Sequence, residues 1–87
     1  MNKYRGEPDE TIDLHGLTRL EAEQALDELL EEESHSHIRI ITGKGVHSAN
    51  GPVLRTFVQE YLAEKGISYS TSKIQDGGEG AIEAFLS

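Results

Sequence analysis

Two amphipathic helical patterns that alternate with short apolar segments constrain the fold of this 87-residue chain more than any other feature. The first pattern runs from about Arg19 to Glu32, and the second begins at Pro52 and ends before Gly66. The segment His37 to Thr42 between them is nearly continuous in apolar character and rich in β-branched residues. A buried strand between two helices predicts an α/β fold in which helical crossovers join parallel strands.

Each helical pattern also carries a start or a stop signal. Thr18 and Glu21 are spaced as a capping box, in which each side chain satisfies a backbone N–H of the first helical turn. Pro52 is tolerated in a first helical turn, and Gly66 suits a C-terminal stop. The apolar positions recur every three or four residues and are expected to face one core: Ala22, Ala25, Leu26, Leu29 and Leu30 in the first helix, and Val53, Leu54, Phe57, Val58, Tyr61 and Leu62 in the second.

Three further segments are predicted to be strands. One contains Ile12 and Leu14, and the other two are Ile67–Ser72 and Ala81–Leu86. The connection through Asp76–Gly80 is short enough for an antiparallel hairpin. The predicted order is β-α-β-α-β-β, and right-handed crossovers then place both helices on one face of the sheet. We therefore expect a two-layer α/β sandwich.

Length and composition indicate a single small domain. Residues 1–10 are polar and resemble a flexible tail or a linker from a longer protein, whereas residues 11–87 are expected to form one domain. The chain has no cysteine, no signal-peptide core and no apolar run near the roughly 18 residues of a membrane span. These features favour a cytoplasmic protein with no membrane partner.

The net charge of −8 argues against strong binding to a polyanion, but the charge is unevenly distributed. Seven of the 16 acidic residues lie between Glu21 and Glu33, and none lies between Ser34 and Gln59. The acid-free stretch contains three of the four histidines together with Arg39, Lys44 and Arg55. One mildly positive face is therefore expected, with weak affinity for a bare nucleic-acid strand.

Asp13 and His15 are candidates for acid/base chemistry. They alternate with the apolar Ile12 and Leu14, so on a strand both would leave the same face. By spacing alone, solvent-facing residues of a half-exposed strand explain this pattern better than catalysis does. The adjacent Gly16 favours the catalytic interpretation.

A glycine-containing loop, Thr42-Gly43-Lys44-Gly45, follows the central strand and has chemistry suited to a phosphate. It is not a Walker P-loop, because Ile38 occupies the place of the first glycine and Gly45 the place of the final Ser or Thr. Binding of a nucleoside triphosphate is therefore not expected. A plain strand-to-loop turn is the alternative interpretation. Because the strands before both motifs are expected to be parallel, the loop and the Asp13–His15 pair should meet at one sheet edge.

Several motifs together resemble the Smr (small MutS-related) domain family. Ile12-Asp13-Leu14-His15 resembles its Leu-Asp-x-His motif, with Ile12 as an aliphatic replacement for Leu, and Thr42-Gly43-Lys44-Gly45 matches its Thr-Gly-x-Gly motif. The segments 47–48, 51–55 and 77–81 are also similar to the family, so the likeness covers about residues 11 to 86. The resemblance implies a fold similar to the C-terminal domain of translation initiation factor 3.

The resemblance also implies a nuclease, because Smr domains are associated with nicking DNA and with cutting messenger RNA on stalled or collided ribosomes. We expect an endonuclease that prefers RNA, since His, Asp and Lys side chains can cut RNA through its 2′-hydroxyl without a metal. In this hypothesis His15 is the general base, and Asp13 holds its tautomer or binds substrate. If the substrate is DNA, Asp13 and His15 are expected instead to hold Mg²⁺ or Mn²⁺.

The remaining candidates are contacts to phosphate or nucleic acid. Lys44 and the amides of residues 43–45 are predicted to clamp a phosphate, and Arg55 to reach one near the start of its helix. The full set of predicted nucleic-acid contacts is Thr42, Gly43, Lys44, Gly45, His47, Ser48 and Arg55. A bystander role for His47 and a surface ion pair for Arg55 are the alternatives. His35 and His37 have no obvious third ligand, so no zinc site is predicted.

Two other functional classes fit the same sequence. A non-catalytic module that binds nucleic acid or the ribosome would keep the fold and the phosphate clamp. A protein-interaction domain would use the acidic helix, for example against a basic ribosomal protein.

Overall fold

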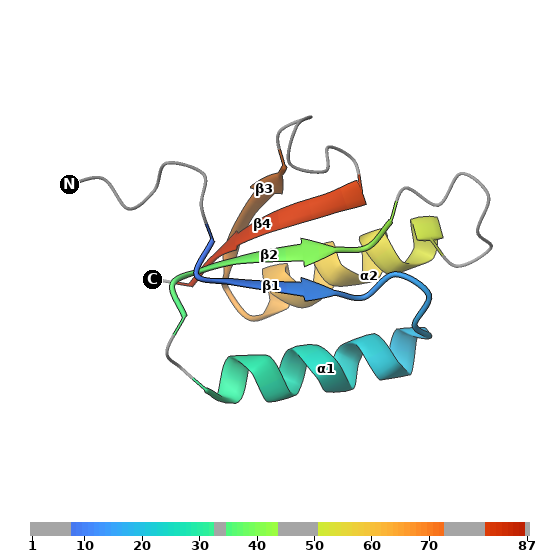
Figure 1. The fold of residues 1–87 in the computed structure, drawn as a ribbon, viewed down its shortest axis with the longest axis horizontal. Coiled ribbons are helices and arrows are strands. Elements are labelled where there is room, and N and C mark those ends of the chain that lie inside the picture. The colour runs from blue at the N-terminus through green and yellow to red at the C-terminus, as the bar shows by residue number, and fades with distance from the viewer. Residues whose placement is uncertain (1–7, 33–34, 44–50, 73–79, 87) are drawn as a thin grey trace.

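The computed structural model describes residues 8–32, 35–43, 51–72 and 80–86, and within these residues one four-stranded sheet carries two helices (Figure 1). The elements in chain order are β1 (Glu10–Asp13), α1 (Arg19–Glu31), β2 (His37–Ile41), α2 (Gly51–Glu64), β3 (Ser68–Thr71) and β4 (Ala81–Phe85). This order confirms the predicted β-α-β-α-β-β arrangement.

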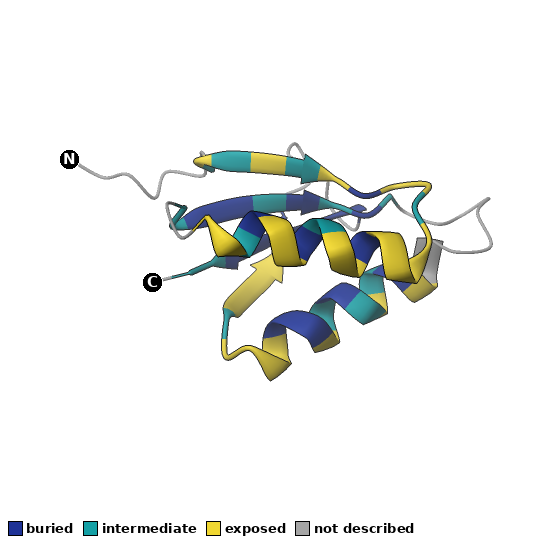
Figure 2. Cartoon of the chain, turned by 90° about the horizontal axis from the view of Figure 1, so that it is seen from below, coloured by how far each residue is buried: buried dark blue, intermediate teal, exposed yellow. Residues whose placement is uncertain are grey.

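The sheet has the strand order β1-β2-β4-β3. β1 and β2 are parallel, whereas β4 is antiparallel to both of its neighbours. β3 therefore runs in the direction of β2, and α2 crosses over β4 to reach it. Since β1, β2 and β3 advance across the sheet in one direction, right-handed crossovers put α1 and α2 on the same face (Figure 2). The two-layer sandwich is confirmed.

The core lies between this face and the helices. Ile38 and Ile40 of β2 and Ile82 of β4 are each at most 1% exposed, and they alternate with residues on the other face of the sheet. The helices contribute the buried residues Ala22, Leu26, Leu29, Leu54, Val58, Tyr61 and Leu62. Leu14, directly after β1, is fully buried. Val53 is predicted to lie in the core but is 53% exposed, because it faces the surface between the helix starts rather than the sheet.

The helix signals act as predicted at α1. The backbone N–H of Thr18 donates to Glu21 Oε1 (2.9 Å), and the backbone N–H of Glu21 donates to Thr18 Oγ1 (3.2 Å). This capping box fixes where the helix begins, at Arg19, four residues after His15. Gly66 adopts φ = +72° just after α2, as a C-terminal stop requires. Neither described helix combines the length and the apolar character that crossing a membrane would require.

The first strand differs from its predicted boundaries. Strand pairing begins at Glu10, and the Asp9 carboxylate accepts hydrogen bonds from the backbone N–H groups of Ser36 (2.5 Å) and His37 (3.2 Å). The bond from Ser36 is the main reason that the pKa of Asp9 is lowered, and the bond from His37 lowers it further. β1 ends at Asp13, so His15 lies in the following turn and not on the strand.

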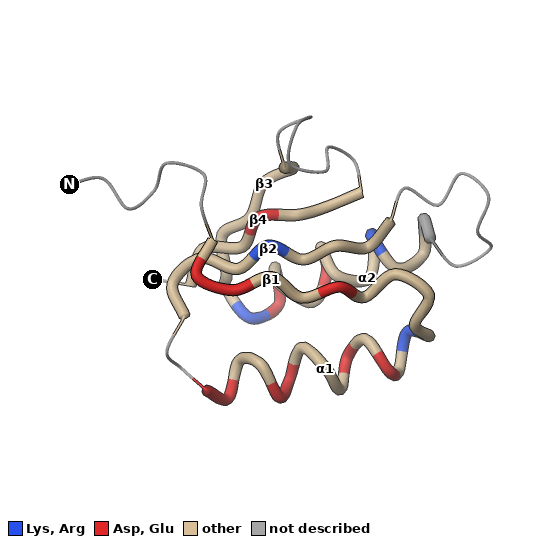
Figure 3. The backbone as a smooth tube through the Cα atoms, in the orientation of Figure 1, with Lys and Arg blue, Asp and Glu red and all other residues tan. Residues whose placement is uncertain are grey.

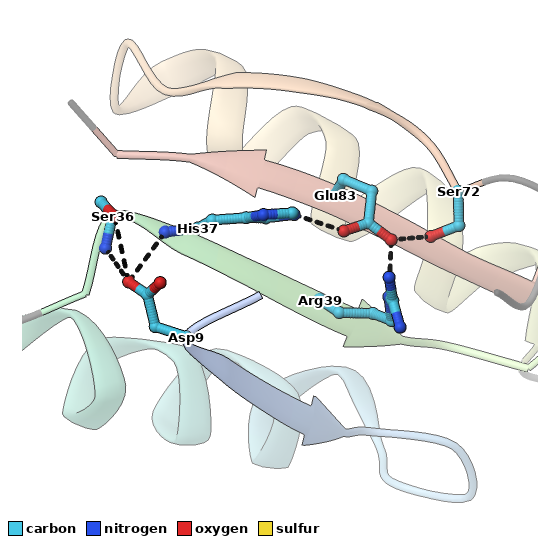
Figure 4. A network of polar contacts seen from close by, with 6 residues as sticks. All are labelled: Asp9, Ser36, His37, Arg39, Ser72 and Glu83. Atoms are coloured by element: carbon cyan, nitrogen blue, oxygen red, sulfur yellow. Dashed lines mark hydrogen bonds and ion pairs between the residues drawn. The ribbon is translucent and has the colours of Figure 1, made fainter. Parts of the chain in front are cut away.

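A polar network occupies the sheet face opposite the helices (Figure 4). At its centre, the Glu83 carboxylate contacts His37 Nε2 (2.5 Å) and accepts hydrogen bonds from Arg39 Nε (2.7 Å) and Ser72 Oγ. Glu83 is only 8% exposed, and burial by itself raises its pKa. The three hydrogen bonds outweigh burial, so the pKa of Glu83 lies below its ordinary value. The network therefore links β2, β4 and the residue after β3 through a buried carboxylate.

Candidate active site at the carboxyl ends of β1 and β2

The carboxyl ends of β1 and β2 meet at one edge of the sheet. Asp13 and Ile41 are partners in the parallel register, and the backbone N–H of Leu14 donates to Ile41 O (2.7 Å). Ile41 is also the register partner of Ala81, so β4 begins at this same edge. Three segments far apart in the sequence therefore come together at the edge where β1 and β2 end and the second motif begins.

A tight turn after β1 carries His15 outward. The backbone N–H of Leu17 donates to Leu14 O (3.0 Å) and closes the turn. Gly16 is the third residue of this turn and has φ = +85°, a left-handed conformation that favours glycine. Because Leu14 anchors the turn in the core, the His15 side chain projects from the edge and is 68% exposed.

Asp13 orients the His15 imidazole. Its Oδ1 atom lies 2.5 Å from His15 Nδ1 and also accepts the backbone N–H of His15 at 3.0 Å. The side-chain hydrogen bond from His15 is the main reason that the pKa of Asp13 lies below its ordinary value. An ionised Asp13 favours the tautomer with the proton on Nδ1, which leaves the Nε2 lone pair as the acceptor. No residue that the structure describes forms a hydrogen bond with Nε2.

The loop after β2 lies directly against this pair. A Cβ atom built on Gly43 would stand 3.4 Å from the Cβ atom of His15, and Gly43 has φ = +80°. The structure thus brings the start of the Thr-Gly-Lys-Gly loop to the Asp13–His15 pair, as the topology predicts. Lys44, Gly45, His47 and Ser48 lie outside the described residues, so their predicted phosphate contacts stay predictions.

Thr42 and Gly43, two of the predicted phosphate contacts, already have hydrogen-bond partners within the protein, and their contact with phosphate stays a prediction. The backbone N–H of Gly43 donates to Gly80 O (3.0 Å), so a phosphate at this amide would have to share or displace that partner. The Thr42 side chain is 1% exposed and directs its hydroxyl to Gly43 O (3.3 Å), while its backbone N–H also donates to Gly80 O (2.8 Å). Both residues hold the loop in place behind the site because β4 begins beside the end of β2.

Gly80 is the residue that sequence reasoning misses at this edge. Its carbonyl accepts from both Thr42 and Gly43, which ties the start of β4 to the loop after β2. The sequence predicts only a hairpin turn for the glycine-rich segment that ends at this residue. Its bonds to Thr42 and Gly43 follow from the antiparallel pairing of β2 with β4, which only the structure shows.

Arg55 lies in the first half of α2, on the helix side of the same sheet edge. It is half-buried, and its Nη2 atom donates to Thr71 Oγ1 (2.9 Å) at the end of β3. This contact ties α2 to the edge strand. A phosphate bound by Arg55 would have to share the guanidinium with Thr71.

A metal ion would find few protein ligands among the described residues of this site. In residues 8–32, 35–43, 51–72 and 80–86, no three His, Cys, Asp or Glu side chains converge. Asp13 and His15 could supply two ligands, provided that water and substrate completed the shell. His35 and His37 have different carboxylate partners, Glu32 (2.9 Å) and Glu83 (2.5 Å) respectively.

Comparisons with known proteins agree with this fold. The family model described as Smr domain matches residues 12–87. A Smr domain-containing protein of Schizosaccharomyces pombe is 40% identical over 83 residues, which cover 91% of this chain but only 38% of the yeast protein. The crystal structure of the Smr domain of Thermus thermophilus MutS2 superposes with a TM-score of 0.77 and 31% identity, over 90% of this chain and 98% of that one. The human small-MutS related domain gives a TM-score of 0.67 and 28% identity, over 87% of this chain and 99% of that one.

Proposed function

Because this chain belongs to the Smr domain family, which is known for nuclease and nucleic-acid-binding roles, we propose that it is an endonuclease with RNA as its preferred substrate. The observation that carries the proposal is the Asp13–His15 pair. An exposed imidazole is held by a carboxylate at 2.5 Å, and its Nε2 has no hydrogen-bond partner among the described residues. An imidazole whose Nδ1 proton is held by a carboxylate can accept a proton at Nε2 and act as a general base.

In the proposed reaction, His15 Nε2 takes the proton of a ribose 2′-hydroxyl. The 2′-oxygen attacks the adjacent phosphorus, and the 5′-oxygen of the next nucleotide leaves with a proton. Asp13 Oδ1 stabilises the imidazolium through the Nδ1 proton and fixes the direction of the ring. The products are a 2′,3′-cyclic phosphate and a 5′-hydroxyl, and they identify this route because hydrolysis by water gives no cyclic end.

Negative charge that builds up on the phosphate requires a cation nearby. Lys44 follows Gly43, whose position against His15 puts the start of the loop at the reacting groups. We assign the phosphate contact to Lys44 and the proton donation to the leaving oxygen to His47, with Ser48 and Gly45 as further contacts. Arg55 is assigned a more distant phosphate along the same edge.

Affinity for a bare strand is expected to be low, because a chain with a net charge of −8 gains little from the release of counterions. We therefore propose that the natural substrate is messenger RNA presented by a larger assembly, such as a stalled or collided ribosome. DNA is the alternative substrate. In that case Asp13 and His15 would hold Mg²⁺ or Mn²⁺, which would activate a water molecule.

The decisive experiment incubates the purified chain with a labelled unstructured RNA and with a supercoiled plasmid, each with magnesium and with chelator at low salt. His15→Ala is compared with the matched control His35→Ala, whose imidazole contacts Glu32 away from the site. We expect RNA cleavage that persists in chelator, leaves cyclic phosphate ends, survives His35→Ala and disappears in His15→Ala.

The other outcomes are equally informative. Cleavage by His15→Ala at the wild-type rate would overturn the assigned site. Nicking of the plasmid only with magnesium would move the assignment to a DNA nicking enzyme. Binding of RNA without cleavage, unchanged in the His15 and Asp13 variants, would identify a non-catalytic nucleic-acid-binding module.

A further inference from the structure

A groove runs along the outer surface of the helix layer, between α1 and α2. It consists of three adjoining hollows of about 300, 470 and 370 Å³. The first two share Phe57, and the second and third share Tyr61, so they form one continuous depression along α2. We call this depression the helix groove and define it by Leu20, Glu23, Val53, Phe57, Glu60 and Tyr61.

The middle of the helix groove is apolar. Leu20 is 63% exposed and Val53 is 53% exposed, which makes them the two most exposed large hydrophobic side chains in the described part of the chain. Phe57 lies between them in the groove wall, and its ring is 5.9 Å from that of Tyr61. Tyr61 is fixed in turn by a hydrogen bond from its hydroxyl to Asp27 Oδ1 (2.6 Å). A rigid aromatic wall flanked by exposed aliphatic side chains is typical of a surface that binds another protein.

The rim of the helix groove is acidic. Glu23 and Glu60 line it, and neither forms an ion pair with any residue that the structure describes. The cations of the groove face its aromatic wall instead, because Arg19 lies 5.2 Å from the ring centre of Phe57 and Lys65 lies 5.0 Å from that of Tyr61. Figure 3 shows acidic residues following one another along α1, whose last turn holds no basic residue. Glu31 lies in this last turn and lines the third hollow, where its carboxylate opposes the helix dipole, so a cationic side chain bound there would relieve an unfavourable charge arrangement.

We propose that the helix groove docks a basic amphipathic segment of another protein, with apolar side chains on one face and Lys or Arg on its flanks. The apolar side chains would cover Leu20 and Val53, and the cations would pair with Glu23 and Glu60. A second copy of this chain is a poor occupant, because a two-fold contact would set one acidic rim against the other. Nucleic acid is repelled by the same carboxylates. The inference goes beyond the proposed nuclease activity and does not depend on it.

The test uses a synthetic peptide of about 15 residues made of Leu and Lys, with Leu at helical spacing so that one face is apolar. A peptide of the same composition but without an apolar face serves as the comparison. Binding is measured by calorimetry, and the site is mapped from shifts of backbone amide signals. We expect the amphipathic peptide to bind more tightly than the comparison peptide and to shift the amide signals of the helix groove.

Variants distinguish binding in the helix groove from a general attraction of the peptide to the negative net charge. Leu20→Ser and Glu60→Lys change exposed residues of the groove, and each should weaken binding about tenfold. Glu28→Lys makes the same charge change at an exposed position of α1 that does not line the groove, and it should alter binding less than about twofold. Equal weakening by Glu28→Lys and Glu60→Lys, equal binding of the two peptides, or no binding would each overturn the proposal. Shifts of the groove signals by RNA instead of the peptide would also overturn it.

Discussion

Gly43 lies so close to His15 that a Cβ atom on the glycine would stand 3.4 Å from the Cβ atom of the histidine. Gly43 also has φ = +80°, a conformation that side chains disfavour. The loop after β2 and the turn after β1 therefore form one structural unit. A change at Gly43 should reach His15 although the two residues are far apart in the sequence.

Gly43→Ala is expected to lower the free energy of unfolding by about 1–2 kcal/mol, because alanine resists a positive φ. The new methyl group also fills the space beside His15, so RNA cleavage should fall by more than the loss of stability explains. Gly66→Ala is the matched control, since Gly66 has φ = +72° and no neighbouring atom lies within 4 Å of the place that a Cβ atom would take there. Urea unfolding and cleavage rates test both variants. Equal cleavage by the two would mean that Gly43 does not position His15.

Asp13→Asn is expected to keep the shape of the turn but to lose the ionised acceptor for His15 Nδ1. The tautomer preference then disappears, and cleavage should fall by about 10²-fold or more. RNA affinity should stay the same or rise slightly, because a negative charge is removed. Single-turnover cleavage and equilibrium binding separate the two effects. Glu28→Gln removes one charge from exposed α1 and should leave cleavage intact, so similar losses in both variants would contradict the role of Asp13.

The elements of this fold could be predicted because their signals are local. The capping box at Thr18 and Glu21 and the apolar spacing of both helices depend on residues within a few positions of one another. The meeting of the Asp13–His15 pair with the Gly43 loop follows from topology, since parallel strands end at the same edge. Neither inference requires knowledge of the side-chain packing.

The features that could not be predicted depend on strand register. Gly80 reaches Thr42 and Gly43 only because Ala81 pairs with Ile41, and Glu83 meets Arg39 only because the two are register partners. Periodicity assigns a residue to a face of a strand, but it does not say which residue of another strand lies opposite. The position of His15 in a turn has a similar cause, because the pairing of β1 with β2 stops at Asp13.

The Glu83 network should make the domain sensitive to acid. The pKa of Glu83 lies below its ordinary value of 4.5, so its ionised form stabilises the fold above that value. This contribution is lost as the pH falls through the lowered pKa of the folded state. Glu83→Gln should lower the free energy of unfolding by about 1–3 kcal/mol at neutral pH, because Arg39 and His37 lose a charged acceptor.

Urea unfolding of the Glu83→Gln variant between neutral pH and pH values below 4.5 tests this prediction. The stability of the variant should decline less steeply in acid than that of the wild type, although Asp9 and Asp13, whose pKa values are also lowered, retain part of the decline. Glu31→Gln, at an exposed position in the last turn of α1, should not lower the stability at neutral pH, because the lost carboxylate opposed the helix dipole. If the unfolding free energies of the Glu83 variant and the wild type fell equally steeply in acid, Glu83 would not be a source of the pH dependence of stability.

The contact between Tyr61 and Asp27 should couple the two helices through a single hydrogen bond. Tyr61 is 6% exposed and donates from its hydroxyl to Asp27 Oδ1 (2.6 Å), so Tyr61→Phe should cost about 0.5–1.5 kcal/mol of unfolding free energy. Burial and this bond raise the pKa of Tyr61 above its ordinary value of 10.0. Its stabilising contribution is therefore present below pH 10.0 and is lost as the pH rises toward the higher pKa of the folded state.

Tyr69→Phe is the control for this contact, because Tyr69 is 39% exposed on β3 and its hydroxyl has no hydrogen-bond partner among the described residues. Thermal or urea unfolding should show a loss for Tyr61→Phe and almost none for Tyr69→Phe. Above pH 10.0, the wild type should lose stability more steeply than Tyr61→Phe, since only the wild type has this buried hydroxyl to ionise. If both variants matched the wild type in stability and in alkaline profile, the Tyr61–Asp27 bond would not help to hold α1 against α2, and the aromatic wall of the helix groove would not need it to stay in place.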